Sequence, residues 1–385
     1  MRSKTKLKTF IFSVIALIIG IASGLSSYVL AFSPQSDTLF SVASGDLSVH
    51  FLELGNKYTG DCIYIKANDN DILIDAGSRQ DSATTISNYV NNYCKDGILE
   101  YVIATHAHQD HIAAFPSTNT RKGIFELYEV KNIIDFGEAT KYERNEASPT
   151  NVYSNYVNYR NLEVEKGAIY TPISSFTEDD FGTEKTQIDL GSGIKLTFLY
   201  NIYYQEKTSN ENNYSVCLLI TQGSTSVLLT GDLEAEGEEE LANHNKNKNI
   251  LPSEVTVFKA AHHGSYTGST SALLDVVNPK NVVFTCVAGA TEYTTNLNNT
   301  FPSQTAIESI ANYTANCYVT TMCTNSKTDL LNKKYSDFTS MNGDIVLISN
   351  KDGYSIKGTN NSTLLKDTTW FSEYRTMPNK WKVAV

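Results

Sequence analysis

The stretch "THAHQDHIAAFP", residues 105–116, places three of the chain's seven histidines and one aspartate within six positions. Neutral imidazoles and a carboxylate at this density are typical ligands of a metal ion. In an extended loop, residues two apart point the same way, so His106 and His108 can hold one ion. Asp110 and His111, one step further round the turn, can hold a second ion nearby. The stretch therefore predicts a metal site rather than a merely polar turn.

Three strand-like runs of the sequence end in candidate ligands. They are residues 101–105 before His106, residues 225–232 with Asp232 as their last residue, and residues 254–261 before His262 and His263. Loops at strand ends commonly display functional groups. A carboxylate on a neighbouring strand, such as Asp232, is placed to bridge two ions. The three clusters together strengthen the prediction of a metal site.

Short apolar runs separated by turn residues predict strands in both halves of the chain. Helix-like stretches follow several of these runs, so the sequence predicts an α/β fold of two sheets with helices outside, a four-layer αββα sandwich. The expected domain covers residues 47–358, after a linker at 32–46. Residues 137–186 have weak periodicity and are expected to form an insertion or lid, and residues 359–385 a loose C-terminal extension.

Residues 1–31 combine a basic head, Arg2 to Lys8, with an uncharged apolar run that ends in "VLA". This pattern predicts an export signal that is either cleaved after Ala31 or kept as a membrane-anchoring helix. The protein is therefore expected to be extracellular, secreted or tethered to the cell membrane. Without the four basic residues of this segment the net charge changes from −11 to −15, which disfavours long-range attraction of nucleic acid.

The six cysteines include no CxxC motif, which excludes a zinc knuckle or a thioredoxin-like motif. Cys62, Cys217 and Cys286 lie inside apolar runs, where buried free thiols are expected. Cys317 and Cys323 are the best candidates for a disulfide, with free thiols as the alternative.

The motif "HAHQDH", residues 106–111, resembles the HxHxDH signature of the metallo-β-lactamase fold. Asp232 matches the bridging aspartate of that fold, and "HHG" at residues 262–264 matches its last histidine. Residues 51–77 and 257–269 are more specifically similar to the extracytoplasmic hydrolase-like domain of ComEC-type competence DNA-uptake proteins. Stand-alone exported phosphodiesterases of the fold, including phosphorylcholine esterases, are also similar. The pore-forming helices of ComEC have no counterpart here, so the resemblance implies no transport.

The resemblance implies two divalent metal ions, zinc or manganese, and a set of metal ligands. These are His106, His108, Asp110, His111, Asp232 and His263. The fold usually supplies another histidine where this chain reads "SNENNYSV", residues 209–216. Asn212, Glu211 or water is expected to complete the first ion's ligands, and an oxygen ligand favours harder ions such as manganese.

The resemblance also separates the neighbouring histidines and assigns supporting residues. His263 directly precedes Gly264 and is expected to bind metal. His262 is expected to contact the phosphate or to support the ligands, with a merely structural role as the alternative. Asp75 is expected to support the metal loop through hydrogen bonds. Asp61 is expected to do the same, with a structural cap as the alternative. His50 and His244 are expected to lie outside the site.

The expected function is an exported metal-dependent hydrolase, most specifically a phosphodiesterase that attacks with a hydroxide made from metal-bound water. Asp110 and His262 are the expected catalytic residues, the first holding the nucleophile's metal and the second stabilising charge. The substrate partner would be a phosphodiester-containing small molecule, a wall component or a nucleic acid, and the membrane is a partner if the N-terminal helix is uncleaved. The alternative is a degenerate metal-binding module that recruits a cell-wall or nucleic-acid ligand without catalysis.

Overall fold

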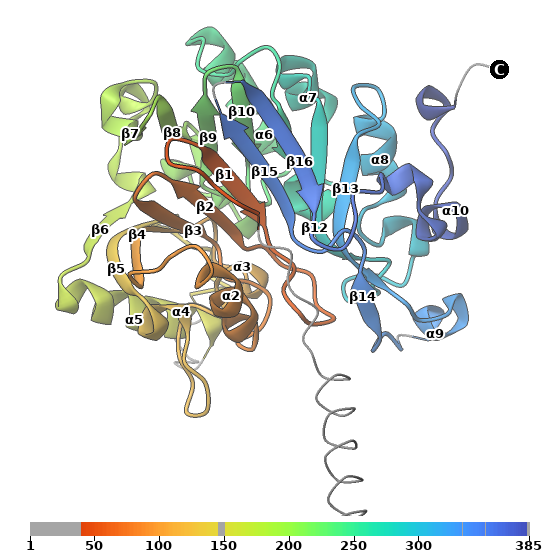
Figure 1. Cartoon of the computed structure of the whole chain (residues 1–385), viewed down its shortest axis with the longest axis horizontal. Helices are drawn as coiled ribbons and strands as arrows, with labels where there is room; N and C mark the ends of the chain where they lie inside the picture. Colours follow the sequence, from red (N-terminus) through yellow and green to blue (C-terminus); the bar gives the residue numbers. More distant parts are fainter. Residues whose placement is uncertain (1–39, 145–150, 333, 351, 383–385) are drawn as a thin grey trace, which may run out of the picture. The chain divides into compact units, whose positions relative to one another are not determined.

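Two eight-stranded mixed sheets form the centre of the protein (Figure 1). The computed structural model describes residues 40–144, 151–332, 334–350 and 352–382. The expected signal or anchor segment, residues 1–31, lies outside the described residues, as does most of the linker. Within the described ranges, no helix is long and apolar enough to cross a membrane.

The first sheet has the strand order β16-β15-β1-β2-β3-β4-β5-β6. Strands β1 to β3 form an antiparallel meander, β4 to β6 continue it in parallel, and the late strands β15 and β16 pair beside β1. The strands are β1 (Leu47–Phe51), β2 (Ile63–Ala67), β3 (Asn70–Ile74), β4 (Ile98–Ala104), β5 (Glu129–Asp135), β6 (Ile169–Pro172), β15 (Ile345–Asn350) and β16 (Gly353–Gly358).

The second sheet repeats this plan with the order β14-β13-β12-β11-β10-β9-β8-β7. Strands β7 to β10 are antiparallel, β11 to β13 continue the sheet in parallel with β10, and β14 pairs antiparallel with β13 at the edge. The strands are β7 (Gln187–Gly191), β8 (Ile194–Leu199), β9 (Cys217–Gln222), β10 (Thr225–Leu229), β11 (Val257–Lys259), β12 (Asn281–Ala288), β13 (Cys317–Cys323) and β14 (Phe338–Ser340).

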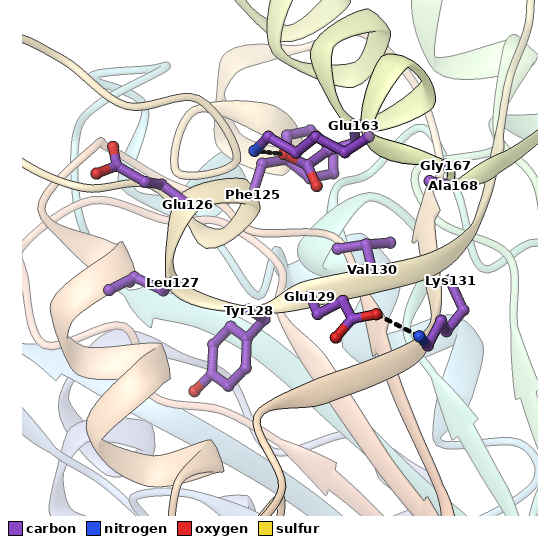
Figure 2. A pocket seen from close by; sticks show the side chains of 11 residues that line it. Phe125, Glu126, Leu127, Tyr128, Glu129, Val130, Lys131, Glu163, Gly167 and Ala168 are labelled. Atoms are coloured by element: carbon purple, nitrogen blue, oxygen red, sulfur yellow. Dashed lines mark hydrogen bonds and ion pairs between the residues drawn. The ribbon is translucent and has the colours of Figure 1, made fainter.

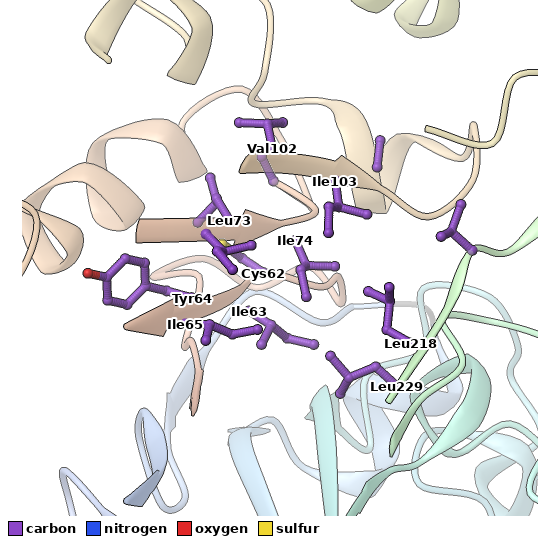
Figure 3. Close-up of a cluster of buried hydrophobic side chains, with 14 of the residues drawn as sticks. Cys62, Ile63, Tyr64, Ile65, Leu73, Ile74, Val102, Ile103, Leu218 and Leu229 are labelled. Carbon is purple, nitrogen blue, oxygen red and sulfur yellow. The ribbon is translucent and has the colours of Figure 1, made fainter. Parts of the chain in front are cut away.

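The two sheets pack against each other through the inward-facing residues of their strands. Figure 3 shows Ile63 and Ile74 of the first sheet pointing towards Leu218 and Leu229 of the second. Successive residues of a strand point to opposite faces, so the neighbouring Leu219 lies on the other side of its sheet. Both faces of the second sheet are therefore buried, one by the first sheet and one by helices.

Helices cover the outer faces and complete the expected αββα sandwich (Figure 1). The larger helices are α2 (Ser82–Val90) and α5 (Val152–Lys166) near the first sheet, and α6 (Ala235–Asn247), α7 (Ser271–Val277) and α8 (Gln304–Ile310) over the second. The shorter ones are α3 (Gln109–Ile112), α4 (Ile124–Leu127), α9 (Lys327–Leu331) and α10 (Thr369–Tyr374). The four-layer α/β fold inferred from the sequence is confirmed.

Three details differ from the sequence-based picture. Residues 137–186, expected to form an insertion or lid, supply helix α5 and the edge strand β6 as well as loops. The C-terminal extension is not loose, because Trp370, Phe371 and Trp381 are buried against the second sheet's helical side. Cys317 and Cys323, the candidate disulfide, lie at opposite ends of β13, and all six cysteines are buried free thiols.

Candidate metal centre

Four buried side chains from three strand ends meet at one edge of the sandwich. Asp110 and His111 follow β4, Asp232 follows β10, and His263 follows β11. Their ligand atoms all lie within 4.8 Å of one another. The Nε2 atoms of His111 and His263 each lie 3.1 Å from Asp232 Oδ2. His263 Nε2 is also 3.5 Å from Asp110 Oδ2.

The donor set fits a divalent metal ion. Neither His111 Nε2 nor His263 Nε2 makes a hydrogen bond, although both atoms are fully buried. Buried polar atoms without a partner are rare, and a shared cation among two imidazoles and two carboxylates would satisfy both. The four residues therefore form one complete candidate metal site.

Two buried aspartates hold the far nitrogens of these imidazoles. His111 Nδ1 lies 2.7 Å from Asp75 Oδ2, and His263 Nδ1 lies 3.2 Å from Asp61 Oδ1 and 3.0 Å from the Thr285 carbonyl oxygen. Asp75 also accepts hydrogen bonds from the Thr105 amide and hydroxyl, both at 2.7 Å. Such partners fix the orientation of a ligating imidazole, so Asp75 and Asp61 aim both Nε2 atoms at Asp232.

His106 and His108 form a separate pair beside this cluster. His106 Nε2 and His108 Nδ1 lie 3.1 Å apart, which allows one ion between them and a further ligand. Burial lowers the pKa of both side chains, and for His106 the neighbouring His111 and His108 lower it further. The two imidazoles are therefore neutral and ready to accept a metal ion.

Asn212 and Glu211 differ in their freedom to complete this pair. Asn212 Oδ1 is buried without a hydrogen-bond partner, while its Nδ2 donates to Glu234 Oε1 at 2.9 Å and lies 3.4 Å from His262 Nδ1. Both Glu211 oxygens are engaged, with the Ala107 amide at 3.1 Å and the Thr140 amide at 2.7 Å. Asn212 is thus the side chain with a free ligand atom, and Glu211 braces the loop between the two histidines.

Charge in the four-residue cluster is balanced by protons when no ion is bound. Burial alone would lower the pKa of His111, but the carboxylates of Asp232 and Asp75 outweigh it and raise the pKa to about 10. Burial likewise opposes the ionised form of Asp232, yet His111, His263 and Lys259 hold its pKa well below the usual value. Metal ions would replace the protons on these imidazoles.

The adjacent histidines His262 and His263 separate because of an unusual turn. His262, His263 and Gly264 have φ values of 47°, 55° and 85°, so the chain leaves β11 through three successive left-handed residues rather than as an extended strand. A Cβ on Gly264 would come within 2.5 Å of the Phe284 ring, so this position requires glycine. His263 ends fully buried among the acidic ligands.

His262 instead faces a cavity next to the cluster. Its side chain is 22% exposed, with Nδ1 3.2 Å from Glu234 Oε1 and 3.0 Å from Thr267 Oγ1. Its Nε2 lies 3.9 Å from Asp232 Oδ2. The cavity has a volume of about 720 Å³ and is also lined by His108, Asp110 and Asn212. Its size suits a small ligand or the end of a larger one.

Sequence reasoning missed two residues that touch the carboxylate ligands. Lys259, the last residue of β11, is fully buried with Nζ 3.3 Å from Asp232 Oδ1. A charged residue inside an otherwise apolar run was the sequence feature that could have indicated it. Tyr293 donates a hydrogen bond from its hydroxyl to Asp110 Oδ2 at 2.7 Å and lines the cavity. It lies in a polar loop with no motif or periodicity that would mark it.

The two remaining histidines lie outside the centre. His50 sits in β1 between Ser48 and Tyr89, each 2.8 Å from one of its ring nitrogens, and burial lowers its pKa to about 3. His244 on α6 lies 3.2 Å from Glu178.

A second cavity, of about 460 Å³, lies between residues 125–131 and the end of α5 (Figure 2). Its polar side chains are taken up in ion pairs, Lys131 with Glu129 and Lys166 with Glu163. Among the described residues, no group of three or more potential metal ligands gathers in its lining, in contrast to the four-residue cluster beside the first cavity.

Comparison with known proteins adds relatives to this geometry. Residues 55–195 match the model of the Metallo-beta-lactamase superfamily. The chain is 37% identical over 79 residues to competence protein ComA of Neisseria gonorrhoeae, covering 20% of this chain and 11% of that protein. It is 34% identical over 76 residues to ComE operon protein 3 of Bacillus subtilis, covering 20% and 9%. The matched stretch thus spans about a tenth of each relative's length.

Among solved structures, the metallo-β-lactamase fold protein YhfI of Bacillus subtilis is 12% identical, with a TM-score of 0.38 over 76% of this chain and 99% of that one. The diiron β-hydroxylase CmlA of Streptomyces venezuelae is 11% identical, with a TM-score of 0.33 over 63% and 45%. Members of the matched superfamily are typically metal-dependent hydrolases. The match over residues 55–195 and the observed architecture agree on a four-layer αββα sandwich of the metallo-β-lactamase type.

Proposed function

We propose that this protein is an exported, metal-dependent phosphodiesterase. The observation that carries the proposal is the cluster of Asp110, His111, Asp232 and His263, in which two buried imidazole nitrogens lack hydrogen bonds. The cluster opens onto a cavity of about 720 Å³ that His262 and Asp110 also line. One edge of the sandwich thus provides both the metal ligands and the space for a substrate.

The metal ions, when bound, would lower the pKa of a coordinated water and polarise the phosphoryl oxygens. The chain's own residues orient the reactants. Glu234 Oε1 lies 3.2 Å from His262 Nδ1 and turns Nε2 towards the centre, where it would donate to a substrate oxygen when the ring carries both protons. Asp75 and Asp61 keep the ligating imidazoles in one ring orientation.

A phosphodiester is favoured over a lactam because the short matches are to competence proteins and because the cavity presents groups suited to a phosphate. His262 and Arg79 both lie on its wall, and Arg79 Nη2 donates a hydrogen bond to Glu292 Oε1 at 2.8 Å. The net charge of −11 disfavours wrapping a long nucleic acid. The proposed substrates are a phosphodiester-containing small molecule, a wall component or the end of a nucleic acid, met outside the cell by a secreted or membrane-tethered enzyme.

A non-catalytic alternative has one specific observation in its favour. His106 and His108 do not join the cluster of four, and the position of the missing histidine is occupied by amide and carboxylate side chains at residues 210–213. A protein with one ion in place of two could recruit a wall or nucleic-acid ligand without hydrolysing it.

Hydrolysis of a chromogenic phosphodiester, bis(p-nitrophenyl) phosphate, separates these functions. The purified full-length chain is stripped of metal, then assayed with manganese or zinc beside the Asp232→Ala variant. Metal-dependent turnover in the wild type, faster with manganese and lost in the variant, is expected. Equal rates for wild type and variant would contradict the proposed catalytic site, and a wild type that binds metal without turnover would favour the recruitment module.

A further inference from the structure

A buried lysine lies directly behind the candidate metal ligands. Lys259 ends β11 and has no exposed surface. A lysine is almost never fully buried unless its charge is paired, because removing an ammonium group from water is costly. Its Nζ lies 2.5 Å from Asp61 Oδ2, 3.3 Å from Asp232 Oδ1 and 3.1 Å from the Gly231 carbonyl oxygen. All three donors of the ammonium group therefore have an acceptor.

Lys259 divides the two oxygens of Asp232 between two tasks. Oδ1 lies beside the lysine, whereas Oδ2 lies 3.1 Å from the Nε2 atoms of both His111 and His263. A carboxylate with one oxygen held in this way cannot rotate without losing an ion pair in a buried setting. Oδ2 alone is thus presented to the cluster.

Lys259 also reaches a second ligand through Asp61. Asp61 Oδ2 is paired with the lysine, and its Oδ1 lies 3.2 Å from His263 Nδ1 and accepts a hydrogen bond from the Thr285 hydroxyl. Rotation of Asp61 would remove one of the two acceptors at His263 Nδ1, the other being the Thr285 carbonyl oxygen. The lysine is therefore linked to two of the four ligands, Asp232 directly and His263 through one carboxylate.

We propose that Lys259 is a positioning residue of the metal centre, which fixes Asp232 as a one-oxygen ligand and, through Asp61, fixes the ring of His263. The inference rests on the metal centre of the proposed function and adds a residue to it. Its loss should weaken metal binding by about 10- to 100-fold, the range typical of residues that orient metal ligands.

The alternative is that Lys259 only neutralises Asp61 for the sake of the fold. Lys259→Met by itself leaves Asp61 buried without its cation, which is strongly destabilising, so this variant alone does not separate the two roles. The double variant Lys259→Met with Asp61→Asn removes one positive and one negative charge together. It keeps the net charge around the ions, and an asparagine Oδ1 at position 61 still offers His263 Nδ1 an acceptor.

The matched control is Lys66→Met with Asp71→Asn. This pair joins β2 and β3 at 2.7 Å, and neither residue contacts the four candidate ligands. Titration of the metal-free full-length chains with manganese, followed through the electron paramagnetic resonance signal of free Mn²⁺, gives the number of bound ions and their dissociation constants. Thermal unfolding of the same metal-free samples reports on the fold.

The double variant at 259 and 61 should unfold near the wild-type temperature and bind manganese 10- to 100-fold more weakly, while the control binds as the wild type does. Wild-type affinity in the double variant would overturn the inference. A double variant as unstable as Lys259→Met would assign the lysine to the fold and overturn it equally. The readout is binding rather than turnover, so a wild type that binds manganese but hydrolyses nothing would refute the phosphodiesterase and leave this inference standing.

Discussion

Alanine substitutions at His262 and His263 should produce two different phenotypes. Both residues have left-handed backbones, at φ 47° and 55°, so the two substitutions place an alanine in similar conformations. The difference between the variants therefore reports on the side chains. His263 supplies one of the four clustered ligand groups, with Nε2 3.1 Å from Asp232 Oδ2 and 3.5 Å from Asp110 Oδ2.

The size of each effect follows from these positions. Loss of His263 leaves three clustered ligands, and metal affinity should fall at least about 100-fold, or about 2.7 kcal/mol, because residues that merely orient ligands already cost 10- to 100-fold. His262 Nε2 is 3.9 Å from Asp232 Oδ2 and faces the cavity. Its loss should leave the metals in place and slow turnover about 10²- to 10³-fold, as for a donor to developing charge.

The assay measures bound metal and phosphodiester turnover on both variants in one buffer. Wild-type protein and His50→Ala serve as controls, because His50 hydrogen-bonds Ser48 and Tyr89 away from the centre. Metal lost from His262→Ala and kept by His263→Ala would refute the assignment of the two histidines.

Three further predictions follow from other contacts. Asn212→His puts an imidazole in place of the amide whose Oδ1 has no hydrogen-bond partner, and should raise zinc occupancy relative to manganese at least about tenfold. Elemental analysis after competition between the two ions measures this ratio. An unchanged ratio would mean that Asn212 is not a ligand of the first ion. Tyr293→Phe removes the hydroxyl that donates to Asp110 Oδ2 at 2.7 Å and should weaken manganese binding about tenfold with the fold intact, as a titration would show; unchanged binding would mean that this hydrogen bond does not support the ligand. Burial raises the pKa of Glu238 to about 7. Glu238 therefore stabilises the fold below its unfolded pKa of about 4.5, and this stabilisation is lost as the pH rises through 7. Glu238→Gln should flatten the resulting decrease in unfolding free energy, about 3 kcal/mol, and an identical pH profile of the variant would contradict the raised pKa.

The strands and the clustering of ligand residues at their ends could be predicted from the sequence because both depend on local pattern. Alternating apolar residues mark strands, and the polar residues that follow the parallel strands β4 and β11 must emerge at a strand's end. Asp232 is likewise placed at the end of β10. The strand ends themselves need no knowledge of long-range packing, whereas the approach of Asp232 to His111 depends on how the two sheets pack, because β4 and β10 belong to different sheets.

Other features depend on tertiary contacts that no local pattern carries. The left-handed turn at His262 and His263 is imposed by the packing of Gly264 on Phe284. Trp370 and Trp381 show no periodicity, yet both are buried against the second sheet's helical side. The role of Lys259 emerges only once β11 is set beside Asp61 and Asp232.

Helix α5 has recognisable boundary residues at both ends. Asn151 caps its first turn by accepting a hydrogen bond from the Ser154 amide at 2.6 Å, and Gly167 ends it with φ 114°. An asparagine and a glycine at these two places are ordinary helix boundaries. Weak amphipathicity between them made the segment resemble a loop.

Metal stoichiometry of the full-length chain tests the central claim most directly. The chain is reconstituted with manganese, freed of unbound metal and analysed for metal per protein molecule, beside His108→Ala and Asp232→Ala. We expect about two ions in the wild type, at least one lost from His108→Ala, and both lost from Asp232→Ala, whose Oδ2 faces two imidazoles at 3.1 Å. A wild type without stoichiometric metal, or an Asp232→Ala variant with the full wild-type content, would contradict the metal centre.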